Sequence, residues 1–209
     1  MVKLQEIGQV HNINFVTPEH VVPQVALAVL HARTLGLKLP IVYNTSAFDS
    51  LGSLDLMDGL VDIYLPDLKV WRRETSKRLL KAENYTETAM HSQVGDLSFT
   101  SDGIAKKGLL VRHLVMPGKE DEGIEIVKWL ASNISKDTSV NIMEQYHPDA
   151  HVGKKKREAS RQTDLQEGVR CADINRAATD IEVGAITKAA RDAGLWRFAE
   201  TAKHGGFNL

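Results

Sequence analysis

Cysteine is almost missing from this chain, since Cys171 is its single representative among 209 residues. One thiol excludes an internal disulfide, and it equally excludes a Cys-x-x-Cys redox pair or a cysteine-rich metal site. We therefore interpret Cys171 as a buried or chemically idle side chain.

Two other features are scarce: long apolar runs and an excess of charge of one sign. No stretch of about 18 apolar residues occurs, and the segment Met1–Val10 mixes Lys3, Gln5 and Glu6 with apolar residues, unlike a signal-peptide core. The formal net charge is -1, whereas nucleic-acid-binding domains are typically basic. We expect a cytoplasmic protein with no membrane partner and no nucleic-acid partner.

The chain is rich in one pattern, in which short β-branched apolar runs alternate with longer segments of helical period. This alternation indicates parallel strands joined by helices. The strands are expected at 11–17, 40–44, 61–65, 109–116 and 139–145. The helices are expected at 22–35, 51–57, 74–94, 123–133 and 180–193, with 195–198 as a further short strand or docking segment.

The length suits one compact domain over residues 1–209, because no repeat and no linker divides it. Its core is expected in residues 1–150, followed by a C-terminal loop and helix in residues 151–209. The basic run Lys154–Arg157 falls in a polar stretch, about 153–166, that is expected to be a mobile loop. A docking patch for an acidic partner or a phosphate is the alternative for that run.

Polar residues follow the expected strands, where the carboxyl ends of parallel strands place ligands in β/α barrels and in doubly wound sheets. They comprise residues 17–20, Asn44–Ser46, Asp67 with Lys69, Arg112–His113 and Gln145–His147. Such a rim suits a small polar ligand, because a carboxylate can bind a hydroxyl or ammonium group and a lysine can bind a carboxylate.

Three of these segments resemble consecutive strands of the pyruvate formate-lyase activating enzymes, which belong to the radical S-adenosylmethionine (SAM) superfamily. Val61–Lys69 resembles the family's VD-x-x-x-x-DLK strand, Leu110–Gly118 the next strand with its terminal Pro-Gly, and Val140–His147 the last core strand with its Tyr-His. His11–Pro18 and Ile41–Ser46 look closer still to an uncharacterised branch of activating-enzyme-like proteins. The resemblance covers about residues 1–150, and Ile174–Arg176 more loosely.

The resemblance implies a partial (β/α) barrel of radical SAM type, with two cofactors, SAM and a [4Fe-4S] cluster. Its activity would be reductive cleavage of SAM to a 5′-deoxyadenosyl radical that abstracts hydrogen, in activases from a glycine of a partner protein. The positions that match the family's SAM site are Asn44, Thr45, Asp67, Lys69 and His147.

The sequence departs from this family in its first segment. It lacks the Cys-x-x-x-Cys-x-x-Cys loop, so no cluster is expected on the chain as written. Thr17–Glu19 stands where relatives carry Gly-Gly-Glu, and Ala47 where many carry glycine. Met1–Gly8 reads as the tail of the helix that follows the missing loop. We therefore expect about five parallel strands with outer helices, the first β-α unit missing, one exposed sheet edge, and a truncated protein that is inactive alone.

Two alternatives of other classes stay open. The missing cysteines favour a non-catalytic remnant that keeps a small-ligand pocket, or an interaction module. A metal-dependent barrel hydrolase would need His147 and His151 to converge with Asp67 or another carboxylate.

Overall fold

The computed structural model of the protein describes residues 1–8, 10–89, 95–154 and 169–199. These residues form an α/β fold with a mostly parallel sheet. Its strands are β1 (Ile13–Val16), β2 (Ile41–Thr45), β3 (Ile63–Pro66), β4 (Ser98–Phe99), β5 (Ala105–Leu114) and β6 (Ser139–Met143). The α-helices are α1 (Val2–Ile7), α2 (Val22–Thr34), α3 (Leu51–Met57), α4 (Arg73–Leu79), α5 (Tyr85–Ala89), α6 (Glu120–Asn133) and α7 (Asp180–Asp192), with short 3-10 turns at Glu19–Val21 and Ala172–Ile174.

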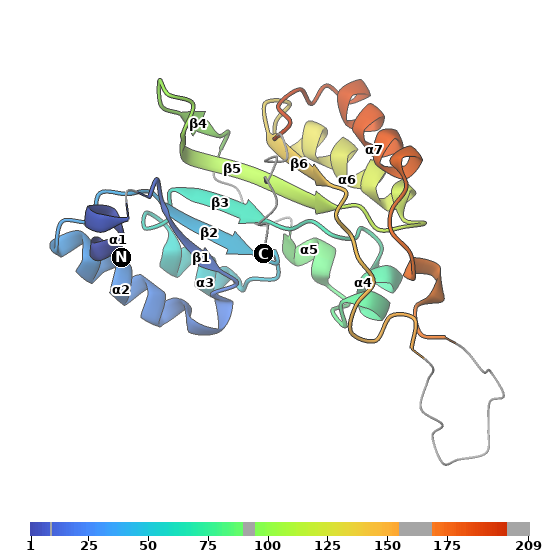
Figure 1. The fold of residues 1–209 in the computed structure, drawn as a ribbon, viewed down its shortest axis with the longest axis horizontal. Helices are drawn as coiled ribbons and strands as arrows, with labels where there is room; N and C mark the ends of the chain where they lie inside the picture. Colours follow the sequence, from blue (N-terminus) through green and yellow to red (C-terminus); the bar gives the residue numbers. More distant parts are fainter. Residues whose placement is uncertain (9, 90–94, 155–168, 200–209) are drawn as a thin grey trace, which may run out of the picture.

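The sheet follows the order of the chain, because β1, β2, β3, β5 and β6 lie side by side and all pair in parallel. Figure 1 shows these arrows pointing the same way, so that their carboxyl ends share one edge. The short β4 adds an antiparallel pairing to the first residues of β5. Beyond β6, Phe198 forms one parallel bridge with Val140.

The two faces of the sheet are packed differently, as the alternation of side chains along a strand requires. On the face that we call the helix face, Ile41 and Tyr43 of β2 join one large apolar cluster with Val25 of α2, Ile126 of α6 and Ile186 of α7. The other face, here called the open face, carries Val16, Val42, Asn44, Leu65, Leu110 and Arg112. Its apolar cluster around Val42 contains no residue of any described helix.

Helices α4 and α5 lie at the arrowhead end of β3 and β5 (Figure 1). A buried carboxylate ties α4 and the segment before it to α6: Glu122 accepts hydrogen bonds from the backbone amides of Trp71 at 2.8 Å and Arg72 at 2.9 Å, and from the Thr75 hydroxyl at 2.6 Å. A buried carboxylate is tolerated when hydrogen bonds satisfy it. Glu122 thereby fixes the segment that leads from β3 to α4.

The five predicted parallel strands are confirmed in order and type, as are the helices predicted over 22–35, 51–57, 123–133 and 180–193. The continuous helix predicted over 74–94 is wrong, because α4 ends at Leu79, Lys81 adopts a left-handed φ of 61°, and a separate α5 begins at Tyr85. Residues 90–94 of that prediction, and residues 155–166 of the predicted loop, lie outside the described residues. Among the described residues β1 pairs with β2 alone, which leaves its other edge free as predicted.

None of the described helices is both long enough and apolar enough to cross a membrane.

Candidate functional site

Four polar side chains meet on the open face, near the carboxyl ends of β2, β3 and β5. Arg112 donates from Nε to Asp67 Oδ1 at 2.6 Å and from Nη2 to Asn44 Oδ1 at 2.7 Å. Lys69 Nζ lies 3.2 Å from Asp67 Oδ2. We call Asn44, Asp67, Lys69 and Arg112 the strand-end cluster.

The backbone places these residues together without a long loop. Asp67 follows β3 directly and forms a parallel bridge with Arg112 of β5, and its amide donates to Thr45 O of β2 at 3.0 Å. The amide of the next residue, Leu68, donates to Arg112 O at 2.8 Å. Three strands thus contribute to one rigid patch, which favours a preformed binding site.

The charges of the strand-end cluster are not balanced. A single carboxylate, Asp67, faces two cations, Lys69 and Arg112, and the three side chains are 14%, 27% and 23% exposed. Partial burial strengthens such interactions relative to a fully hydrated surface pair. The cluster can therefore bind a carboxylate or another anion through its cations, and an ammonium or hydroxyl group through Asp67.

Arg112 connects the cluster, although the sequence placed it only among the polar residues of the rim. Its alternation with Val111 and His113, both buried on the helix face, puts its side chain on the open face. The alternation of buried residues in β5 was the sequence signal that could have placed Arg112 on the same face as Asn44. Asn44, Asp67 and Lys69 lie together where the sequence predicted a SAM site.

Thr45 lies on the opposite face from Asn44. Its buried hydroxyl donates to Asp49, and Tyr43 donates to the same carboxylate at 2.8 Å. Burial is the main cause that raises the pKa of Asp49, and the nearby Glu19 carboxylate raises it further, while the bonds from Thr45 and Tyr43 act in the opposite direction. Thr45 thus packs behind the strand-end cluster and not within it.

The loop after β1, which contains Thr17–Glu19, is bound to the start of α3. Glu19 accepts hydrogen bonds at 3.0 Å from the Ser50 amide and from the Ser53 hydroxyl. Thr17 at φ 50° and Ala47 at φ 62° adopt the left-handed conformation that glycine adopts most readily. Both residues adopt this conformation although neither is a glycine.

His147 is exposed beyond the end of β6, and no hydrogen bond or ion pair among the described residues joins it to the strand-end cluster. In the described part of the chain, no three His, Cys, Asp or Glu side chains lie close enough to hold a metal ion. The hydrolase alternative required such convergence of His147, His151 and a carboxylate, so it is not carried further.

The two cofactors that the resemblance implies, SAM and a [4Fe-4S] cluster, fit the residues of this chain differently. SAM offers a carboxylate, an ammonium group and ribose hydroxyls, and the strand-end cluster presents partners for each of these. A [4Fe-4S] cluster needs several thiolates, whereas Cys171 is the one cysteine of the sequence. The polar groups of the strand-end cluster are thus compatible with those of SAM, whereas the residues of this chain do not fit an iron–sulfur cluster.

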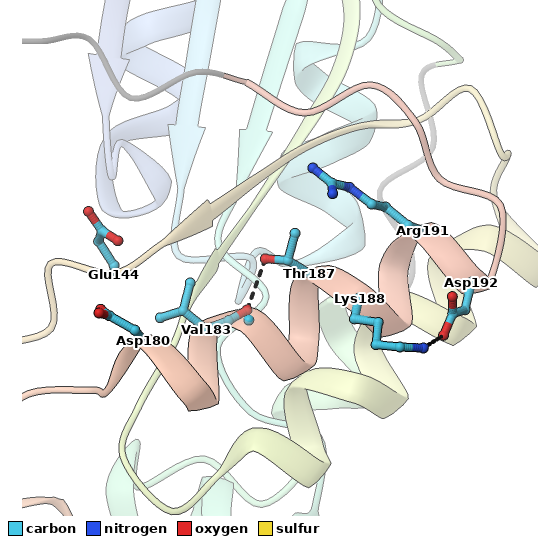
Figure 2. Close-up of a pocket in the computed structure, with 8 residues that line it drawn as sticks. Glu144, Asp180, Val183, Thr187, Lys188, Arg191 and Asp192 are labelled. Carbon is cyan, nitrogen blue, oxygen red and sulfur yellow. Dashed lines mark hydrogen bonds and ion pairs between the residues drawn. The ribbon is translucent and has the colours of Figure 1, made fainter.

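A separate hollow of about 470 Å³ lies along α7, beside the residue that follows β6. Figure 2 shows Glu144 and Asp180 at one end of it and the Lys188–Asp192 ion pair at the other, with Arg191 nearby. Its mixed charges are largely paired or exposed, and no member of the strand-end cluster lines it. The hollow is thus distinct from the predicted site.

No protein-family model matches the chain. It is 29% identical over 139 residues to the uncharacterized protein MJ0674 of Methanocaldococcus jannaschii. The matched part covers 66% of this chain and 38% of that protein, so the chain spans well under two thirds of this relative's length.

Proposed function

We propose that the chain is the SAM-binding part of a radical SAM protein of the activating-enzyme type, built on a partial (β/α) barrel, and that the strand-end cluster binds SAM. The observation that carries the proposal is the hydrogen-bonded group of Asn44, Asp67 and Arg112 with Lys69, on the sheet face that the described helices leave uncovered. The DLK segment of the resemblance supplies two of these four residues.

The arrangement of the sheet supports the proposal in a second way. Five parallel strands follow one another in chain order, as in a β/α barrel, where the functional groups stand at the carboxyl ends of the strands. A doubly wound sheet would reverse its strand order at one point and place helices on both faces. The sequential order, and a sheet face whose apolar cluster contains no residue of the described helices, favour the barrel type.

Each polar group of the cluster has a complementary group in SAM. Arg112 and Lys69 bind the methionyl carboxylate, and Asp67 accepts hydrogen bonds from the ammonium group or a ribose hydroxyl. Asn44 keeps its amide nitrogen available, because its oxygen already accepts from Arg112. When bound to a reduced cluster, SAM supplies a 5′-deoxyadenosyl radical in this superfamily.

No step of that radical chemistry is assigned to residues of this chain, because they do not fit the iron–sulfur cluster. The cluster would have to be held by cysteines that the 209 residues do not contain. Activity toward a protein substrate would likewise depend on such cysteines.

The single cysteine specifically favours a second candidate function, in which the protein is non-catalytic and binds a small ligand at the strand-end cluster. The two candidates differ in whether a cysteine-bearing segment restores iron binding and SAM cleavage. Anaerobic reconstitution of the chain with iron and sulfide, followed by metal analysis and visible absorbance, is expected to leave it iron-free under either candidate. If adding a cysteine-bearing segment restores iron binding and SAM cleavage, the radical SAM candidate is supported and the non-catalytic candidate is excluded.

Calorimetric titration with SAM tests the proposed binding site. Asp67→Asn is expected to weaken SAM binding about tenfold or more, because it removes the charge that orients Lys69 and Arg112, at a cost of about 1.5–3 kcal/mol. Asp173→Asn is the matched control, since Asp173 also faces an arginine and a lysine, with Arg78 Nη1 at 2.8 Å and Lys119 Nζ at 3.5 Å. Equal affinities of Asp67→Asn and wild type would contradict the proposal.

A further inference from the structure

In the Asp67–Lys69 turn, all three backbone amides and the carbonyls of Asp67 and Leu68 are hydrogen-bonded by other parts of the chain. The amides of Asp67 and Leu68 donate to carbonyls of neighbouring strands. Two buried side chains bind the remaining groups. The Tyr85 hydroxyl donates to Asp67 O and accepts from the Lys69 amide at 3.2 Å, while His113 Nδ1 lies 2.7 Å from Leu68 O.

Tyr85 binds both sides of the turn at once. Its side chain comes from α5, is 2% exposed, and packs with Val70 and Met116 above the strand ends. The half-exposed ring of Phe48 stacks on it, with ring centroids 6.2 Å apart and an angle of 24° between the planes. Burial is the main cause that raises the pKa of Tyr85, so the phenol keeps its proton.

His113 binds the middle of the turn from the helix face. A carbonyl oxygen can only accept, so Nδ1 carries the proton and donates to Leu68 O. Burial lowers the pKa of His113 below its ordinary value, which keeps the ring neutral. Its Nε2 has no hydrogen-bond partner among the described residues, and a Cβ on Gly123 of α6 would lie 2.7 Å from it.

We infer that Tyr85 is a positioning residue for the strand-end cluster, and that with His113 it holds the 67–69 turn in its binding geometry before any ligand arrives. This inference rests on the proposed function, because it concerns how Asp67 and Lys69 are presented to SAM. A site whose groups are held in place in advance spends less binding energy on ordering them. Because the Tyr85 hydroxyl already fixes the backbone on both sides of the turn, less conformational freedom is lost at Lys69 when a ligand binds.

Tyr85→Phe removes the hydroxyl and keeps the ring and its stacking on Phe48. SAM affinity is expected to fall roughly fivefold and the melting temperature by a few degrees, because the neutral hydrogen bonds to Asp67 O and from the Lys69 amide are lost. Tyr146→Phe is the matched control, because its hydroxyl also donates to a backbone carbonyl, Ile174 O at 3.0 Å, without contact to the turn. Its SAM affinity should stay within about twofold of wild type.

A readout without ligand tests the preformed turn directly. Amide hydrogen exchange followed by NMR should show the Lys69 amide protected in wild-type protein without SAM. Tyr85→Phe should raise its exchange rate about tenfold or more relative to Leu68, because local opening then frees that amide. A purely structural loss would raise both rates together.

The outcomes separate this inference from the proposed function. If Asp67→Asn abolishes SAM binding but Tyr85→Phe binds like wild type, the positioning role is overturned and the proposed function stands. If Asp67→Asn binds SAM like wild type, the proposed function fails, and the Lys69 exchange rate still decides whether Tyr85 holds the turn. A Lys69 amide that is unprotected in the free wild-type protein overturns the inference outright.

Discussion

The two faces of the sheet differ in what covers them and in which groups they present. On the helix face, Tyr43, Ile126 and Ile186 belong to one apolar cluster that runs from α2 to α7, and their side chains are almost fully buried. On the open face, Val16 is 66% exposed and Arg112 keeps part of its guanidinium accessible. Adjacent residues of one strand can thus belong to opposite environments.

This difference separates stability from binding. The hydrophobic effect scales with the apolar surface removed from water, so the helix face must supply most of the folding energy. The open face holds a charged group whose Coulombic energy is largely offset by its own desolvation, and the side chains of that group stay partly exposed. Substitutions on the two faces should therefore move different quantities.

The largest effect is expected from Ile126→Ala on the helix face. Ile126 is fully buried in the main cluster, and truncating such a side chain leaves a cavity that costs about 2–5 kcal/mol. Ile181→Ala on α7 is the matched control, because Ile181 is 84% exposed and its loss should change the free energy of unfolding by less than about 0.5 kcal/mol. Denaturant unfolding checks both, and similar costs would contradict the assignment of the faces.

Glu182→Gln should cause the next largest loss of stability, because the Glu182 carboxylate connects α7 to the turn after β5 through hydrogen bonds. Its carboxylate accepts from Arg176 at 2.7 and 2.8 Å, from the Gly118 amide at 2.6 Å and from the Thr179 amide at 2.8 Å. We expect a loss of about 1–3 kcal/mol near neutral pH. Glu125→Gln, which loses an exposed contact of 3.6 Å to Lys128, should cost less than about 0.5 kcal/mol.

The free energy of unfolding measured at acidic pH tests the role of Glu182 a second time. The Arg176 guanidinium is the main cause that lowers the pKa of Glu182 below 4.5. A carboxyl with a lowered folded-state pKa stabilises the protein above its unfolded pKa and loses that contribution as pH falls through the folded one. Wild type should therefore lose stability below about pH 4.5 more steeply than Glu182→Gln. Parallel curves would contradict the role of this ion pair.

Asp49→Asn should change the free energy of unfolding less than Glu182→Gln does, and the pH dependence of the change should run in the opposite direction. Burial raises the pKa of Asp49 above 3.8, so its contribution to stability is present below that value and is lost as pH rises through the folded-state pKa. The neutral amide should lose less stability than wild type as the pH rises, with a difference below about 1 kcal/mol. A constant difference between pH 4 and pH 8 would contradict the raised pKa.

The smallest effect is expected from Val16→Thr on the open face, where the added hydroxyl stays in water. The free energy of unfolding should change by less than about 0.5 kcal/mol. Val140→Thr makes the same substitution on the helix face, where Val140 is fully buried in β6, and should cost about 1–3 kcal/mol through its desolvated hydroxyl. Equal costs at the two positions would remove the contrast between the faces.

Most of the fold follows from the sequence, because the switch between strand and helix periods is a local signal. The parallel strands and the helices α2, α6 and α7 were predicted close to their bounds for that reason. Strand β4 was missed because its two residues are too few to show alternation. The break between α4 and α5 falls at Lys81, whose left-handed φ was not predicted from the helical period.

The candidate site could be predicted only in part. The strand-end rule placed Asn44, Asp67 and Lys69 at one edge, because carboxyl ends of parallel strands coincide. It could not tell that Thr45 faces the helices, since this depends on the phase of alternation in β2, nor that Arg112 links the group. His147 follows β6 by several residues, and the strand rule does not fix a side chain that far from the sheet.

The most direct test of the central claim is NMR mapping of backbone amides during titration of the wild-type protein with SAM. The account predicts saturable shifts centred on residues 44, 67–69 and 112, with no change along α7. Shifts confined to the hollow of Glu144, Asp180 and Arg191, or no saturable shifts at all, would contradict binding at the strand-end cluster.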